Sequence, residues 1–411
     1  DLHAAGLSTS AGAVVAARLS TLSPQAQLTL KVASVLGRSC GIERLARVHP
    51  EGLSEKDLNQ DLADVEALGL GTRTNDRFRF HHAIIVENAY SLLLRRQKRD
   101  LHRMVAKELD IDKAEPALRA YHWDQSGAAP RAIPLYKEAA EQSAARQAHS
   151  ETSRLLERAF ALMNEVDAPL QKTDRAGMHL SLAEAQRSLG NQTGAMENLA
   201  AVATLTERPL PRGKISGVVD LTRRYWQTRR MKIVEIGDDH TRRAALQAAR
   251  AHLMRGEIAY DQQDTAVVLH GTFSGAAASL KGPENSPELL RSLAQLALVG
   301  LYVPQLVNSD LHIARATQLA RHCNDLAGRS WAMIVMAGYH TGQGRFAQAV
   351  AMSKTALSDA ETAREVKNVE YAQASLANIL RLQGYIARSQ EHNLAVYQSG
   401  NDRGVAQVRL W

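Results

Sequence analysis

The sequence has few of the residues that build covalent or metal cross-links. Its 411 residues include two cysteines, Cys40 and Cys323, which lie far apart in the chain. Two separated thiols form neither a disulfide framework nor a cysteine-based metal cluster. The simplest interpretation is a protein of the reducing cytoplasm.

Aromatic residues are also scarce, at 5%, and runs of β-branched residues are short. Hydrophobic residues make up 45% and charged residues 23%, which is typical of a globular chain. Alanine and leucine are abundant, and both favour helices. The length suggests two or three domains, and the composition predicts a mainly α fold.

Motifs for phosphate binding, metal binding and nucleophilic catalysis are missing. The chain has no GxxxxGK[ST], GxGxxG, HExxH, CxxC or GxSxG. The acidic pair Asp238 and Asp239 beside His240, and the pair Asp310 and His312, lack a third ligand at helical spacing. We interpret the Asp238 group as a helix cap. We therefore expect no catalytic residue, metal or cofactor in this chain, and no turnover of ATP by it.

Long apolar segments are absent too. The most apolar stretch, residues 294–307, is short for a membrane span and contains Pro304. No signal peptide is recognisable. Because the first residue is Asp1 rather than methionine, we expect the chain to begin within a longer protein.

Positive charge exceeds negative charge, with a net charge of +7. The densest basic run is RRQKR at 95–99, followed by Arg103 and Lys107. On a helix these side chains spread around more than one face, which favours a solvated surface over a nucleic-acid contact.

Residues 1–110 read as one small unit. Glycines at 69 and 71 and the turn residues Asn75 and Asp76 precede a stretch in which Phe78 and Phe80 alternate with arginines, which predicts a β-hairpin near 70–82. A helix from about 84 to 109 is expected next. The helices expected before the hairpin are 11–22, 24–37, 42–48 and 55–68. Three helices followed by a hairpin is the order of a winged helix.

From about residue 116 the pattern is helical, with a recurring spacing of small residues. A glycine is followed at offsets of five, nine and twelve by small or apolar residues, as in tetratricopeptide hairpins, where short side chains let two helices cross closely. The pattern occurs after Gly127, Gly190, Gly344 and Gly384. We expect an α-solenoid of tetratricopeptide-like hairpins in two halves, 116–205 and 218–411, separated by a loop at 206–217. A further loop is expected at 281–288.

Several segments resemble a known family. They are LSTLSPQAQLTLKVASVLGRSC (19–40), FRFHHAIIVENAY (78–90), LLRRQKRDLHRMVAKELD (93–110) and PALRAYHWDQSGAAPRAIPLYKEAA (116–140). They resemble the winged helix and first repeats of bacterial class III adenylate or guanylate cyclases fused to a signalling NTPase, and of related large ATP-dependent regulators. The resemblance is most specific over 19–140. Ser39 and Cys40 depart from it, because an aromatic residue often stands there, and the later repeats are irregular.

The resemblance implies that the cyclase domain and an NTPase module using ATP or ADP with magnesium lie upstream of this chain. It also implies that His82, with His81 beside it, contacts the nucleotide phosphates. The alternative is that His82 caps the helix that follows. Phe78, Phe80 and Tyr90 are interpreted as core residues.

The resulting hypothesis is a cytoplasmic regulatory region that couples nucleotide state to a protein or peptide bound on the repeats. Two alternatives remain, a DNA-binding winged helix with repeats and a plain scaffold. DNA binding is less favoured because the helix expected at 55–68 carries Glu55, Asp57, Asp61, Asp64 and Glu66, which phosphates would repel.

Overall fold

The structure is a computed structural model that describes residues 12–166, 170–211, 213–229, 238–305 and 307–402. The chain divides into two compact units. Unit 1 comprises residues 1–140 and 157–168, and unit 2 comprises residues 141–156 and 169–411. Helices dominate both, as the composition predicted, and the described strands form one small sheet in unit 1.

Unit 1 begins with a helical stretch at 12–20. The elements that follow are α2 (Pro24–Leu36), β1 (Ser39–Gly41), α3 (Ile42–Val48), α4 (Glu55–Ala67), β2 (Gly71–Arg73) and β3 (Arg77–Phe80). The expected helices are therefore present, with ends that differ by one or two residues. Caps explain two of the starts, because the Ser23 hydroxyl accepts from the Ala26 amide and the Ser54 hydroxyl accepts from the Asp57 amide.

The hairpin was expected, but the sheet has a third strand that was not. β3 lies in the centre and pairs antiparallel with both β1 and β2. Cys40 of β1 lies opposite Phe78 of β3. A strand of three residues, Ser39 to Gly41, is too short to show an alternating pattern in sequence. Burial raises the pKa of the Cys40 thiol to about 12, which makes it an unreactive core residue.

Both phenylalanines of the hairpin are core residues, as expected. Phe78 and Phe80 are fully buried, with ring centroids 5.0 Å apart in an edge-to-face arrangement. They share one core cluster with leucines of several surrounding helices, including Leu30, Leu62 and Leu109. The hairpin is thus fixed to the helices by its inward face.

The single helix expected over 84–109 was wrong. The chain forms α5 (Ala83–Ser91) and α6 (Arg95–Ile111), with a break at residues 92–94. Leu93 is buried at the break, and the Leu94 amide donates to Oε1 of Gln97, which starts the second helix. The change of direction lets α6 place Leu101 and Leu109 in the same core. Its basic residues are mostly exposed, which agrees with a solvated helix surface.

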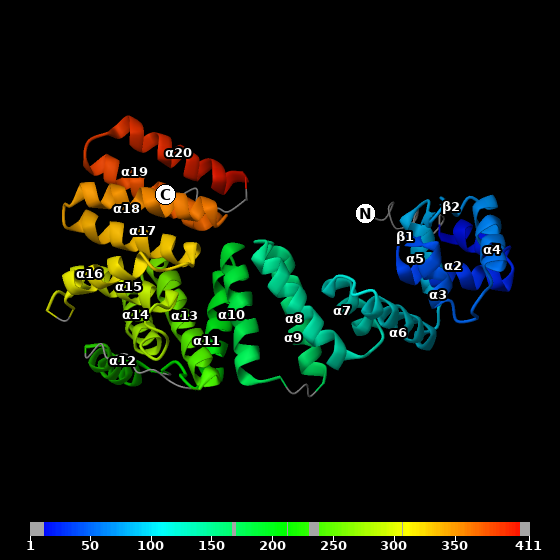
Figure 1. Cartoon of the computed structure of the whole chain (residues 1–411), viewed down its shortest axis with the longest axis horizontal. Coiled ribbons are helices and arrows are strands. Elements are labelled where there is room, and N and C mark those ends of the chain that lie inside the picture. Colours follow the sequence, from blue (N-terminus) through cyan, green and yellow to red (C-terminus); the bar gives the residue numbers. More distant parts are fainter. Residues whose placement is uncertain (1–11, 167–169, 212, 230–237, 306, 403–411) are drawn as a thin grey trace. The chain divides into compact units, whose positions relative to one another are not determined.

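Helical hairpins make up the rest of the chain (Figure 1). The earlier helices are α7 (Pro116–Gln125), α8 (Ala129–Ala145), α9 (His149–Glu165), α10 (Lys172–Ser188) and α11 (Gln192–Leu205). The later ones are α13 (Asp239–Asp261), α14 (Thr265–Ser279), α15 (Pro287–Tyr302), α16 (Ser309–Ala320), α17 (Leu326–Gly342), α18 (Phe346–Thr362), α19 (Val366–Leu382) and α20 (Ile386–Asp402). In unit 2 each hairpin packs against the next, as in an α-solenoid.

The turn between helices uses a left-handed residue. At the end of α17, Gly344 has φ of 70°, and the Arg345 amide donates to the His340 carbonyl, which is a Schellman turn. The other three predicted glycines have the same sign of φ. Five further turns of this kind use residues with side chains, namely Lys113, Gln147, Glu207, Gln263 and Arg364.

The small residues at the predicted offsets are buried where the helices cross. Ala349, Ser353 and Ala356 of α18 have no exposed surface. The same spacing after Gly384 has one exception, because Asn393 is exposed and lines a cavity. Our interpretation of Asn393 as a packing residue was therefore wrong. On α20, Leu394 and Tyr397 are exposed in the described part of the chain.

The loop expected at 206–217 is shorter than predicted. An additional helix, α12, covers Lys214–Arg229 and so includes the last residues of the expected loop. It packs on α14 through Leu221 and Tyr225, outside the series of hairpins. The two prolines, Pro209 and Pro211, lie before it in the remaining loop. The loop near 281–288 is present and ends where Ser286 caps α15.

We expect Gly344→Ala to destabilise the chain by about 1 kcal/mol, because an L-residue pays a conformational cost at positive φ. A Cβ at this glycine would meet no atom within 4 Å, so the effect would come from the backbone alone. Gln343→Ala is the matched control, since its φ is −91°. Urea unfolding of both variants checks the prediction, and equal midpoints would contradict it.

Candidate functional site

The two histidines of the 78–90 segment have different surroundings. His81 holds the hairpin, because its Nδ1 lies 2.9 Å from the Gly69 carbonyl and its Nε2 contacts the Thr72 hydroxyl. His82 occupies the N-cap position of α5, but its side chain makes no capping hydrogen bond and is exposed. The alternative that the His82 side chain caps α5 is therefore wrong. Contact of His82 with a nucleotide stays a prediction.

A chain of buried rings joins α5, α6 and α7 inside unit 1. The Tyr90 hydroxyl lies 3.0 Å from Nε2 of His102, and Nδ1 of His102 lies 3.0 Å from Nδ1 of His122. Both histidines are almost fully buried, whereas Tyr90 is only partly buried. Lys98 lies over the Tyr90 ring at 4.4 Å. We call Tyr90, His102 and His122 the histidine chain.

The two imidazoles of the histidine chain resist protonation. Two facing Nδ1 atoms form one hydrogen bond only when one carries a proton and the other does not. Burial lowers the pKa of His102 to about 4, assisted by Lys98. Burial and the neighbouring His102 lower the pKa of His122 to about 3. The histidine chain therefore connects the segment after the hairpin to the first repeat helix through two rings that resist protonation.

An apolar cavity in unit 2 lies along the first helices of successive hairpins, α13, α15, α17 and α19. Its volume is about 710 Å³. Four aromatic side chains line it, and we call it the aromatic groove. They are Tyr260, Tyr302, Trp331 and Tyr371. Aliphatic residues such as Leu298 complete the wall.

Polar groups sit at defined places in the aromatic groove. At one end, Arg187 pairs with Glu257, and the Tyr371 hydroxyl donates to Asp261 at 3.4 Å. Burial raises the pKa of Tyr371 to about 12 and also raises the pKa of Asp261. Along the wall, Asn378, Arg381 and Asn393 offer amide and guanidinium groups. A largely apolar cavity with a few directed polar groups is the usual form of a ligand site.

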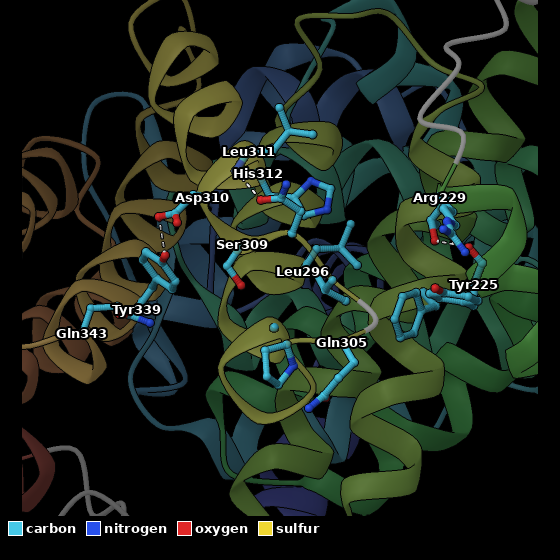
Figure 2. Close-up of a pocket in the computed structure, with 16 residues that line it drawn as sticks. Tyr225, Arg229, Leu296, Gln305, Ser309, Asp310, Leu311, His312, Tyr339 and Gln343 are labelled. Carbon is cyan, nitrogen blue, oxygen red and sulfur yellow. Dashed lines mark hydrogen bonds between the residues drawn. The ribbon is translucent and has the colours of Figure 1, made fainter.

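A second, more polar pocket of about 550 Å³ lies between α12, α15 and α17 (Figure 2). The Tyr339 hydroxyl donates to Asp310 at 2.7 Å, and Arg345 lies 3.3 Å from the same carboxylate. These two donors hold the pKa of Asp310 below its usual range. His312 is buried beside it. Asp310 thus links α16 to Tyr339 and Arg345, whereas His312 is a buried residue.

Asp238 caps α13, as expected, by accepting from the amides of His240 and Thr241. Across the residues the structure describes, no group of three or more histidine, cysteine, aspartate or glutamate side chains is placed to hold a metal ion. In the same residues no helix is both long enough and apolar enough to cross a lipid bilayer.

No protein-family model and no curated protein matches the sequence. One similar solved structure is a Signal Transduction ATPase with Numerous Domains protein with a tetratricopeptide repeat sensor, from Pyrococcus horikoshii. The identity is 11% and the TM-score 0.36, and the match covers 95% of this chain and 59% of that chain. A similarity of this level assigns no function.

Sequence reasoning found parts of these sites but not their assembly. Tyr90 was expected in the core, yet its hydroxyl meets His102, a partner twelve residues away on another helix. The aromatics of the groove come from four helices spread over more than a hundred residues. A tyrosine or tryptophan on the first helix of several successive hairpins is the signal that could have revealed the groove.

We expect the chain to lose stability as pH falls below 6.5, because His102 and His122 bind protons when unfolded but resist them when folded. Their contribution is complete above pH 6.5 and disappears as pH falls through about 4 and 3. The maximum slope is about 1.4 kcal/mol per pH unit for each histidine.

Urea unfolding at pH 7 and pH 5 checks this expectation. The variant His122→Asn should lose less stability between pH 7 and pH 5, because it lacks one imidazole that takes up a proton on unfolding. His322→Asn is the control, since His322 is exposed. An identical loss in wild type and His122→Asn would contradict the prediction.

Proposed function

We propose that this chain is the regulatory, ligand-binding region of a signalling NTPase, and that the aromatic groove binds a protein or peptide partner. The observation that carries the proposal is the groove itself. Tyr260 and Tyr302 are 56% and 72% exposed although large apolar side chains favour burial. Residues with such exposure on one cavity wall are suited to contact with another molecule.

The form of the groove favours an extended or helical peptide. It runs across the first helices of four hairpins, so a linear ligand can contact several repeats at once. Apolar side chains of the ligand would pack on Tyr302 and Leu298. Backbone amides would meet Asn378 and Asn393. Such a division of apolar and amide contacts is common in peptide recognition.

The N-terminal unit supplies the proposed connection to nucleotide. Its order of helix, strand, two helices and hairpin is typical of a winged helix. We propose that an attached NTPase module binds ATP or ADP with magnesium, that His82 contacts the phosphates, and that a class III cyclase domain belongs to the same protein. Catalysis would then reside in those modules and not in this chain.

The DNA-binding alternative receives less support. Glu55 and Asp57 lie exposed at the start of α4, where phosphates would be repelled. Asp61 does not contribute to this repulsion, contrary to our expectation, because it is buried and accepts a hydrogen bond of 2.6 Å from Thr29. The scaffold alternative differs from the proposal in one respect, since a scaffold would bind its partner without any effect on nucleotide.

The groove is tested by selecting peptides from a displayed library on the full chain and measuring their affinity by fluorescence polarisation. We expect Tyr302→Ala to weaken the selected peptides at least tenfold, because truncation of an aromatic hot-spot residue costs about 2 kcal/mol or more. Tyr385→Ala is the matched control, since Tyr385 is also exposed but lies outside the groove. Peptides that bind both variants as well as wild type would refute the assignment.

The contact of His82 is tested in the protein that carries the NTPase module. We expect His82→Ala to weaken ADP about tenfold or more, since a charge-assisted hydrogen bond contributes about 1.5–3 kcal/mol. The thermal midpoint should change little, because the side chain is exposed. His81→Ala should show the opposite pattern, as His81 holds the hairpin. Unchanged ADP affinity in His82→Ala would remove the proposed contact.

A further inference from the structure

We propose that unit 2 contains a second binding site, a polar chamber beside the aromatic groove that takes a small oxyanion, a carboxylate or a phosphate, with an adjacent hydroxyl. The chamber has a volume of about 370 Å³. It is lined by Arg187, Arg250, Arg291 and Lys367, and we call it the arginine chamber. These cations come from four different helices, α10, α13, α15 and α19.

Three of the cations converge on one carboxylate. Arg187 forms an ion pair with Glu257, and the other oxygen of Glu257 lies 3.7 Å from Arg291 and 3.9 Å from Arg250. The Glu257 side chain is 6% exposed. Burial opposes its ionisation, but the three guanidinium groups hold its pKa below the usual range. Glu257 is therefore a buried anion that three cations share.

The donors outnumber the acceptors that the protein supplies. A guanidinium group has five N–H donors, whereas a carboxylate accepts about four hydrogen bonds. Nε of Arg187 and one terminal nitrogen of Arg250 are buried without a hydrogen-bond partner. Oε1 of Glu257 also lacks one. Buried groups of this kind are costly unless something pairs with them.

Each of the remaining acids that line the chamber has a hydrogen-bond partner or a reduced charge. Glu184 accepts from Nε of Arg250 at 3.0 Å, and Glu365 accepts from Gln147 at 2.9 Å. Asp325 caps α17 by accepting from the Gly328 amide. Burial raises the pKa of Glu288, which favours its neutral form. Glu184 thus compensates Arg250, but none of these acids forms a hydrogen bond with the buried Nε of Arg187 or with the unpaired terminal nitrogen of Arg250.

The pKa values of the four cations are shifted in different directions. Those of Arg187 and Arg250 are raised although burial opposes this, because carboxylates pair with them. Burial, followed by repulsion from Arg250, lowers the pKa of Arg291 to about 10. Burial, followed by repulsion from Arg187, lowers the pKa of Lys367 to about 7. An oxyanion beside these groups would stabilise their charged forms. The N-termini of α15, α17 and α19 reach the same chamber and add a favourable dipole.

The walls limit the size and shape of the ligand. Arg291 lies over the Trp331 ring at 5.1 Å, and Tyr371 closes the side shared with the aromatic groove. The volume lies at the lower end of the range of small-molecule pockets, which suits a small molecule rather than a peptide. A hydroxyl on the ligand would donate to Glu257 while its oxyanion accepts from Arg187 and Arg250.

The test uses two small probes, inorganic phosphate and glycolate, each of which carries an oxyanion and a hydroxyl. The thermal midpoint of the full chain is measured at pH 6.5 with each probe, against chloride at equal ionic strength. We expect the probes to raise the midpoint by about 2 °C or more. A shift with one probe alone identifies its group as the ligand chemistry. No shift with either probe would overturn the proposal.

Variants locate the effect. Arg291→Gln and, in case it folds poorly, Lys367→Met should reduce the shift to a third or less of the wild-type value. Lys354→Gln also removes one positive charge, but from an exposed position on α18, and should keep the full shift. Tyr302→Ala should keep it too, which separates the chamber from the groove. A full shift in both chamber variants, or a loss in Lys354→Gln, would show that the anions act on net charge rather than in the chamber.

Discussion

The structure depends on close contact between neighbouring helices, and small residues make that contact possible. At the crossing of α13 and α14, a Cβ atom on Gly271 would lie 2.7 Å from the His252 carbonyl and 2.9 Å from Gly256. No side chain larger than hydrogen fits there without a shift of the backbone. In α18 the same requirement is met by Ala349, Ser353 and Ala356, all without exposed surface. Because the helices approach so closely, the large side chains of the first helices are directed elsewhere, and several line the aromatic groove.

Buried charge is the second consequence of this packing. Where α10, α13 and α15 meet, Arg187, Arg250 and Arg291 share the carboxylate of Glu257. Such groups carry a large desolvation cost, so they contribute little net stability even when paired. Their arrangement fixes the relative positions of three helices that are far apart in sequence. The same cations line one cavity, while Trp331 and Tyr371 line both that cavity and the groove. A ligand in either cavity would therefore contact side chains that also line the other cavity.

In unit 1, hydrogen bonds between rings fix the relative positions of neighbouring helices. Tyr90, His102 and His122 come from three consecutive helices and lie in one line of contacts. The basic surface of α6 stays in solvent while its other face carries His102 into the interior. A protein whose N-terminal unit reports on nucleotide would need a firm connection of this kind to its first repeat helix.

The sequence by itself determined the fold class, the helices before the hairpin and four of the nine left-handed turns described between helices from α6 onward, since alanine and leucine content, capping residues such as Ser23 and the glycine spacing are local properties. It missed the turns made by Gln263 and Arg364, because a side chain does not reveal a positive φ that the packed helices impose. It also missed strand β1 and the break before α6, where burial of Cys40 and Leu93 decides the chain direction. Only the tertiary structure brings Tyr90, His102 and His122 into one line of contacts. It also brings the four groove aromatics into one cavity. The physical reason is that both sites join side chains from separate helices, and their partners are set by how the helices pack rather than by their neighbours in the chain.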